Sequence, residues 1–161
     1  MKSREWSCKS SVESAAARSS VLRGVMMRDD NCIFCKIANG QIPAATLYED
    51  QRFRVIMDLG PASKGHALIL PKEHAANLFD LPEEYAREAL PVAQKVGKKL
   101  YEGLGCDGFN VVQNNGTCAG QTVFHFHMHL IPRYEGDTVN VAWIPGTLTD
   151  EVRQEVLDLF E

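Results

Sequence analysis

Short runs of apolar residues predict the strands of this chain. Residues 52–57 alternate loosely between polar and apolar side chains, as a half-buried strand does. Residues 66–71 are mostly apolar and end at a proline, which indicates a short buried strand that stops there. Residues 109–113 and 123–132 carry a similar strand-like pattern. We therefore expect these segments to build a sheet.

Apolar residues at intervals of three and four predict one long helix, from about residue 82 to residue 101. The segment Asp80-Leu-Pro-Glu83 has the acidic cap, the early proline and the third-position glutamate of a helix start. Pro91 lies inside the repeat and predicts a kink. Gly103 and Gly105 follow the repeat and are expected to end the helix.

Three shorter helices complete the pattern, at residues 32–38, 73–79 and 150–160. The second is expected to be only one or two turns long, and Thr149 caps the third. A regular alternation of strand and helix is typical of a parallel sheet, and this chain does not show one. We therefore expect the α+β class, with a mainly antiparallel sheet and helices packed against it.

The composition limits the size and the partners of the protein. Its 161 residues, of which 45% are apolar and 24% charged, suit one domain. The net charge of −4 argues against a protein that coats a nucleic-acid polymer, because such proteins rely on a basic surface. The apolar runs are too short to cross a bilayer, so we expect no membrane partner.

Residues 1–28 differ in composition from the rest of the chain. They hold six Lys/Arg and two Glu, a net charge of +4, whereas residues 29–161 hold 11 and 19, a net charge of −8. The segment is rich in Ser and Ala and lacks the apolar stretch of a secretory signal. We expect a disordered extension followed by one domain over residues 29–161, in a cytoplasmic protein. Arg and Ser with few acidic residues leave organelle targeting by residues 1–28 as an alternative.

Three of the five histidines fall in His125-Phe-His-Met-His129. Residues two apart in a strand share a face, so the three imidazoles should point one way while the apolar residues between them enter the core. Three imidazoles can hold a catalytic metal, or one can act as a nucleophile beside the others. The preceding loop, residues 114–121, is rich in Gly and Asn and can turn N–H groups toward a phosphate. That loop favours the nucleophile.

The segment Val123-Phe-His-Phe-His-Met-His-Leu-Ile-Pro132 resembles the signature of the histidine triad (HIT) family of nucleotide hydrolases and transferases. The resemblance spans residues 31–140 and continues through Ile42-Pro43, Tyr48-Glu-Asp50, Gly65-His-Ala-Leu-Ile-Leu-Pro71, Asn114 and Gly120-Gln-Thr122. It implies a homodimer whose subunit has a five-stranded antiparallel sheet, one long helix and short helices. It also implies hydrolysis at the α-phosphate of nucleoside 5'-phosphoramidates, or of related purine mononucleotide conjugates, through a nucleotidyl-histidine.

The family pattern, carried over by position, assigns roles to individual residues. It implies that His127 is the nucleophile, and neutral imidazole suits this role because its ordinary pKa is about 6.5. His129 would contact the α-phosphate oxygens, and His66 and Thr122 would line the same site. Asp58 would accept hydrogen bonds from both ribose hydroxyls. The other substrate-binding positions are Leu59 against the base and Asn114, Gly120 and Gln121 around the phosphate.

The cysteines point to a metal. Five cysteines without a secretory signal favour a metal site or free thiols over a disulfide framework. Cys32 and Cys35 form a Cys-x-x-Cys pair, the usual half of a tetrahedral zinc site. The resemblance is to the family branch that carries this pair. It implies that His74 and His125 complete one structural zinc site per chain, with no organic cofactor.

The sequence leaves alternatives open. One alternative to the zinc site is that the cysteine pair is a redox dithiol, although the strand and helix context of a thioredoxin-like motif is missing. Another is that the pair binds no metal. The three histidines of residues 125–129 would hold the zinc of a metallohydrolase. The protein would otherwise be a nucleotide-binding module whose turnover is incidental.

Overall fold

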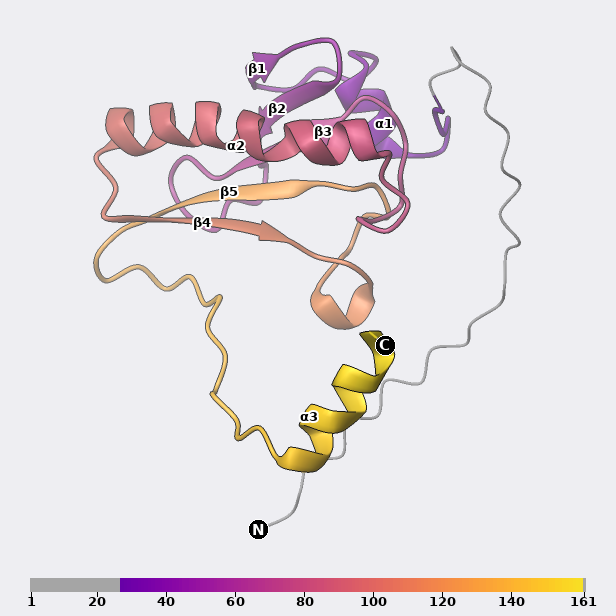
Figure 1. The fold of residues 1–161 in the computed structure, drawn as a ribbon. Coiled ribbons are helices and arrows are strands. Elements are labelled where there is room, and N and C mark those ends of the chain that lie inside the picture. Colours follow the sequence, from indigo (N-terminus) through magenta and orange to yellow (C-terminus); the bar gives the residue numbers. More distant parts are fainter. Residues whose placement is uncertain (1–26, 161) are drawn as a thin grey trace.

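The computed structural model of the chain describes residues 27–160, and a five-stranded antiparallel sheet forms its centre (Figure 1). The strands are β1 (Thr46–Glu49), β2 (Phe53–Met57), β3 (Ala67–Pro71), β4 (Gly108–Gln113) and β5 (Met128–Arg133). Their order across the sheet is β1-β2-β3-β5-β4, and every neighbouring pair is antiparallel. The expected α+β class is confirmed. Of the predicted extension over residues 1–28, all but the last two residues lie outside the described part of the chain.

The long helix α2, Glu83–Leu104, packs against one face of the sheet. The core between them is built from one apolar stripe of the helix and from alternate positions of the strands. Its members include Tyr85, Ala89, Val92, Val96, Phe53, Val55, Ile69 and Leu130. Burying each large apolar side chain contributes on the order of 1.5–3 kcal/mol. This layer therefore supplies much of the stability of the fold.

The ends of α2 correct the prediction in two details. Asp80 is not the cap, because Pro82 holds the N-cap position without a side-chain hydrogen bond. At the other end, Gly105 adopts a left-handed conformation with φ of 61°, and its N–H donates to the carbonyl of Tyr101. The helix therefore runs to Leu104, beyond the predicted end at residue 101. Pro91 lies inside the helix, and the kink there stays a prediction.

The short helix α1, Ile33–Ala38, packs on the other face of the sheet. Side chains alternate between the two faces of a strand, so Leu68 and Leu70 of β3 point away from the α2 layer. They form a second apolar cluster with Ala38 and Ile56. This cluster fixes α1 beside β3, and the short helix expected at residues 32–38 is confirmed.

Residues 73–79 form no helix, contrary to the prediction. Their backbone groups bond to distant segments instead. The N–H of His74 donates to the carbonyl of Met27 at 2.7 Å, and the carbonyl of Ala75 accepts from the N–H of Phe126 at 2.6 Å. These tertiary hydrogen bonds replace the local bonds that a helix would make. The segment therefore joins the N-terminal part of the domain to the histidine-rich segment.

The strand β5 begins at Met128, not at Val123 as predicted. The N–H of His125 donates to the carbonyl of Val123 at 2.9 Å, which closes a tight turn outside the sheet. Phe126 and Met128 still enter the main core, as expected from their alternation with the histidines. Only His129 of the three histidines therefore lies within the strand.

The C-terminal helix α3, Asp150–Leu157, is followed by a single 3-10 turn, η2, at Asp158–Phe160. The predicted cap is confirmed, because Thr149 Oγ1 accepts from the N–H of Val152 at 3.4 Å. Figure 1 shows α3 apart from the sheet, and residues 140–160 are all exposed. In the part of the chain that the structure describes, no helix has the length and apolar character needed to span a membrane.

Candidate active site and adjoining Cys/His cluster

The backbone determines which nitrogen of His127 carries the proton. Its Nδ1 lies 2.7 Å from the carbonyl oxygen of His125, and a carbonyl can only accept. Nδ1 therefore donates, and in the neutral ring Nε2 keeps a lone pair. The imidazole is buried, with 5% of its surface exposed. The ring of Phe34 contacts it edge-on, with 5.1 Å between centroids and 78° between the ring planes.

A second chain of hydrogen bonds orients His129. The N–H of Ala62 donates to Nδ1 of His66 at 3.0 Å, so the proton of neutral His66 sits on Nε2. That proton points to Nδ1 of His129, 2.9 Å away. The proton of neutral His129 is therefore on Nε2. Because the rings of His127 and His129 lie 5.0 Å apart, this N–H can donate to an oxygen on a phosphorus atom held at His127.

Burial keeps this pair of imidazoles neutral. It lowers the pKa of His129 to about 4, with smaller contributions from the neighbouring His127 and His66. Burial also lowers the pKa of His66, and the carboxylate of Asp58 opposes that shift. Asp58 Oδ2 lies 3.6 Å from His66 Nε2. Both rings are therefore uncharged near neutral pH, and the tautomers described above are the relevant forms.

Asp58 closes the turn after β2 and borders the histidines. Its Oδ1 accepts from the N–H of Gly60 at 2.8 Å, and its own N–H donates to the carbonyl of His66 at 3.1 Å. The side chain is only half-buried. The next residue, Leu59, is 99% exposed, so an apolar side chain stands beside the carboxylate with nothing of this chain covering it. Both positions suit the ribose and base contacts that the resemblance implies.

The glycine-rich loop is held together by its own hydrogen bonds. Gln121 is buried, and its Oε1 accepts from the N–H of Gly116 at 2.8 Å. The N–H groups of Gly120 and Gln121 donate to the carbonyls of Thr117 and Gly116 inside the loop. These two amides would have to break those bonds to hold a phosphate. Asn114 lies half-buried at the start of the loop, and Thr122 is exposed at its end.

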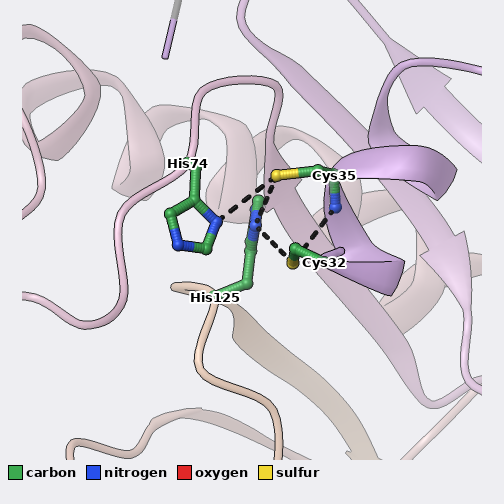
Figure 2. A group of neighbouring side chains, drawn as sticks. All are labelled: Cys32, Cys35, His74 and His125. Atoms are coloured by element: carbon green, nitrogen blue, oxygen red, sulfur yellow. Dashed lines mark hydrogen bonds between the residues drawn. The ribbon is translucent and has the colours of Figure 1, made fainter. Parts of the chain in front are cut away.

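Cys32, Cys35, His74 and His125 form the Cys/His cluster (Figure 2). Their candidate ligand atoms all lie within 4.8 Å of one another. His125 is fully buried, and its Nε2 lies 3.0 Å from the carbonyl of Pro71, so Nε2 donates and Nδ1 keeps the lone pair. That Nδ1 lies 3.5 Å from both sulfur atoms. His74 directs its own Nδ1 to Cys35 Sγ at 3.4 Å.

The chemistry of the cluster fits a zinc ion. Two thiolates and two neutral imidazoles are a common tetrahedral zinc set. Burial raises the pKa of the Cys35 thiol to about 11, so the sulfur keeps its proton unless a cation stabilises the thiolate. Burial also lowers the pKa of His125 to about 4, which keeps this imidazole in the neutral form that binds metals. The predicted four-residue set therefore comes together as expected.

Asp58, His66 and His129 form another group whose candidate ligand atoms lie close together. Here the hydrogen bonds argue against a metal, because Nδ1 of His66 accepts from the N–H of Ala62 and its Nε2–H donates to His129. No lone pair of that ring remains in the plane for a cation. Neither of these groups, which were sought among residues 27–160, contains His127. Among these residues, the three imidazoles of His125, His127 and His129 do not converge on one point, so the structure does not support the catalytic-zinc alternative.

Comparison with known proteins identifies the family. The HIT domain family model matches residues 39–136. A HIT family protein from Bacillus anthracis has a solved structure with a TM-score of 0.75 and 41% identity, over 81% of this chain and 95% of that one. This chain belongs to the HIT family. The adenosine 5'-monophosphoramidase HNT1 of Saccharomyces cerevisiae is 44% identical over 76% of this chain and 75% of its own length. A zinc-bound histidine triad family protein from Mycobacterium smegmatis shares the fold with a TM-score of 0.65 and 37% identity, covering 81% and 98%.

Sequence reasoning missed several partners in this HIT domain. The carbonyls of His125 and Pro71 and the N–H of Ala62 set the histidine tautomers, but backbone groups occur in every residue and leave no trace in the sequence. Phe34 lies between Cys32 and Cys35, and its sequence position indicates an apolar helix residue but not its contact with His127.

Proposed function

We propose that this HIT-family protein hydrolyses nucleoside 5'-phosphoramidates, or related purine mononucleotide conjugates, at the α-phosphate. The single observation that carries the proposal is the tautomer of His127. Its Nδ1–H is held by the carbonyl of His125, so Nε2 presents a lone pair beside a hydrogen-bond donor on His129. The printed name of the yeast relative, adenosine 5'-monophosphoramidase, supports this class of substrate.

The proposed reaction has two displacements at phosphorus. In the first, the lone pair of His127 Nε2 forms a bond to the α-phosphorus while the bond to the leaving amine breaks, and the amine takes a proton from water. The carbonyl of His125 stabilises the resulting imidazolium through Nδ1–H. His129 Nε2–H donates to a non-bridging oxygen, where charge develops. In the second, water attacks phosphorus and releases the nucleoside monophosphate and neutral His127.

Substrate contacts follow from the groups that border the histidines. The carboxylate of Asp58 offers two acceptor oxygens to a ribose cis-diol, and Leu59 offers an apolar surface to the base. Thr122 and Asn114 stand at the two ends of the loop and can donate to the phosphate or the leaving group. The thiols of the Cys/His cluster require a reducing compartment, which favours the cytoplasm.

Replacement of the nucleophile tests the proposal. His127→Ala should lower kcat for adenosine 5'-phosphoramidate by about 1,000-fold or more, since no other group can form the covalent bond. The affinity for AMP, measured by calorimetry, should stay within about threefold, because the other contacts remain. Mass spectrometry of wild-type protein quenched in denaturant at alkaline pH should show an adenylylated chain that the variant lacks, since acid would hydrolyse the bond between phosphorus and histidine. A variant that keeps more than about a tenth of the turnover would refute the nucleophile.

Metal analysis tests the Cys/His cluster. We propose one structural zinc per chain, and Cys32→Ser should lower the zinc content and the melting temperature because a thiolate ligand is lost. Cys118→Ser is the matched control, since Cys118 lies in the loop outside the cluster and should leave both quantities unchanged. Equal zinc content in wild type and Cys32→Ser would contradict this ligand assignment.

A further inference from the structure

Helix α1 and its N-cap residue Cys32 carry the two thiols of the Cys/His cluster, and α1 also carries an aromatic ring that contacts His127. It has only six residues, too few to be stable without tertiary support. At its start, the sulfur of Cys32 accepts from the N–H of Cys35 at 3.5 Å. At its end, Arg54 donates to the carbonyl of Ile37 at 2.7 Å. The position of the helix therefore depends on the cluster at one end and on β2 at the other.

Phe34 is the residue of α1 that faces the histidines. Its ring lies edge-on to His127, at 5.1 Å and 78°, and edge-on to His125, at 6.0 Å and 88°. The side chain is half-buried and packs against the apolar cluster formed by Ala38, Ile56, Leu68 and Leu70. The ring therefore contacts His125 of the Cys/His cluster, the proposed nucleophile His127 and the face of the sheet on which α1 packs.

Two constraints hold the imidazole of His127. The hydrogen bond from Nδ1 to the carbonyl of His125 holds one edge of the ring. The edge-on contact with Phe34 limits the remaining rotation about the Cα–Cβ and Cβ–Cγ bonds, because a turned imidazole would collide with the aromatic ring. Both constraints originate at the cluster: His125 is one of its candidate ligands, and Phe34 lies between the other two.

We propose that Phe34 is a positioning residue that couples the Cys/His cluster to His127, so that assembly of the cluster aims Nε2 at the α-phosphorus. The inference rests on the proposed role of His127 and goes beyond it. It gives the metal site a second function besides stabilising the fold.

Phe34→Leu removes the ring and keeps an apolar side chain of similar bulk. We expect kcat to fall about tenfold, the rate equivalent of one edge-on aromatic contact, while the KM and the zinc content stay near wild type. Phe34→Tyr keeps the ring and should restore kcat. Ile33→Leu is the matched control on the exposed side of the same helix and should leave kcat unchanged.

A double-mutant cycle tests the coupling itself. Cys32→Ser should also lower kcat, but it should add little in the Phe34→Leu background, because both changes act through one contact. Equal effects of Cys32→Ser in both backgrounds would overturn the proposal. An unchanged kcat in Phe34→Leu, or a raised KM with unchanged kcat, would overturn it too, and the latter would make Phe34 a substrate contact.

Imidazole NMR gives a readout that does not depend on turnover. Long-range proton–nitrogen spectra at about pH 8, above the ordinary imidazole pKa, should show wild-type His127 as the Nδ1–H tautomer. Phe34→Leu should show a mixture of tautomers, and Ile33→Leu should not. An unmixed tautomer in Phe34→Leu would reject the positioning role. Failure of His127→Ala to lose activity would instead reject the proposed function, so the two failures are distinguishable.

Discussion

His129 is a residue whose folded environment opposes its protonation. It accepts at Nδ1 from His66 and lies beside His127, so an added proton would face two imidazoles and little solvent. These surroundings lower its pKa to about 4, whereas an unfolded histidine titrates near 6.5. As the pH falls from 6.5 to 4, the unfolded chain therefore takes up a proton that the folded chain excludes, and stability is lost in this range.

Comparison with His129→Asn tests this linkage. Urea unfolding between pH 7 and 4 should show a smaller loss of stability in the variant than in wild type. The difference in slope should stay below about 1.4 kcal/mol per pH unit, the value for one whole proton, because solvent screens a partly exposed site. Loss of the proposed zinc at low pH should affect both proteins alike. Parallel slopes would show that His129 does not resist protonation in the fold.

The sequence could predict that the histidines of the site and the members of the Cys/His cluster lie close together, but not how each one is oriented. The alternation of His125, His127 and His129 and the Cys-x-x-Cys pair placed the candidate nucleophile and the four cluster residues, through the resemblance. The choice between Nδ1 and Nε2 depends on carbonyl and N–H groups that no residue type encodes. The availability of the loop amides was overestimated for the same reason, since those of Gly120 and Gln121 bond within the loop.

Among the elements, periodicity predicted α2 and four of the five strands, whereas the fifth strand, β1, was implied only by the resemblance. Local patterns failed where hydrogen bonds to distant segments determine the structure. Residues 73–79 have a helix-compatible sequence, yet Ala75 and its neighbours bond to Phe126 and other remote groups. The same bond keeps residues 123–127 out of β5. Both corrections concern the connection between the histidine-rich segment and the rest of the fold. There, the backbone groups form tertiary hydrogen bonds instead of those of a regular helix or strand.

Gly65 shows how closely these elements approach one another. Its φ is +89°, and a Cβ at this position would lie 2.3 Å from Leu104 Cδ1 and 3.2 Å from Pro132 Cγ. Gly65→Ala should therefore destabilise the protein by about 2 kcal/mol or more, through backbone strain and overpacking. Gly103→Ala, in open space within α2, should instead stabilise by up to about 1 kcal/mol. Urea unfolding measures both, and a neutral Gly65→Ala would contradict the packing described here.

At the scale of the whole molecule, one apolar groove of about 600 Å³ follows α2 and the edge strand β4. Leu90, Phe109 and Val111 contribute to its lining, and Leu90 is 65% exposed. An edge strand beside an exposed apolar helix face is typical of a surface that a second copy covers. We therefore predict that the homodimer implied by the resemblance forms through this surface of α2 and β4.

Sedimentation tests the dimer. Wild-type protein at micromolar concentration should sediment as a dimer, and Val111→Glu should shift it toward monomer, because the carboxylate would be buried against apolar side chains. Phe79→Glu is the matched control, since Phe79 is 82% exposed and lies outside the groove lining. A monomeric wild type, or equal behaviour of the two variants, would contradict an interface here.

A peptide carbonyl accepts the hydrogen bond from His127, and this affects how the sequence around it can diverge. A main-chain oxygen accepts the hydrogen bond that selects the reactive nitrogen, so no side-chain acceptor has to be preserved for that purpose. Phe126 and Met128 can exchange with other apolar residues as the core repacks, and the nucleophilic atom stays the same provided the turn keeps its shape. Sequence change in this segment is therefore limited by backbone geometry, and any sequence that keeps the turn keeps the same reactive nitrogen.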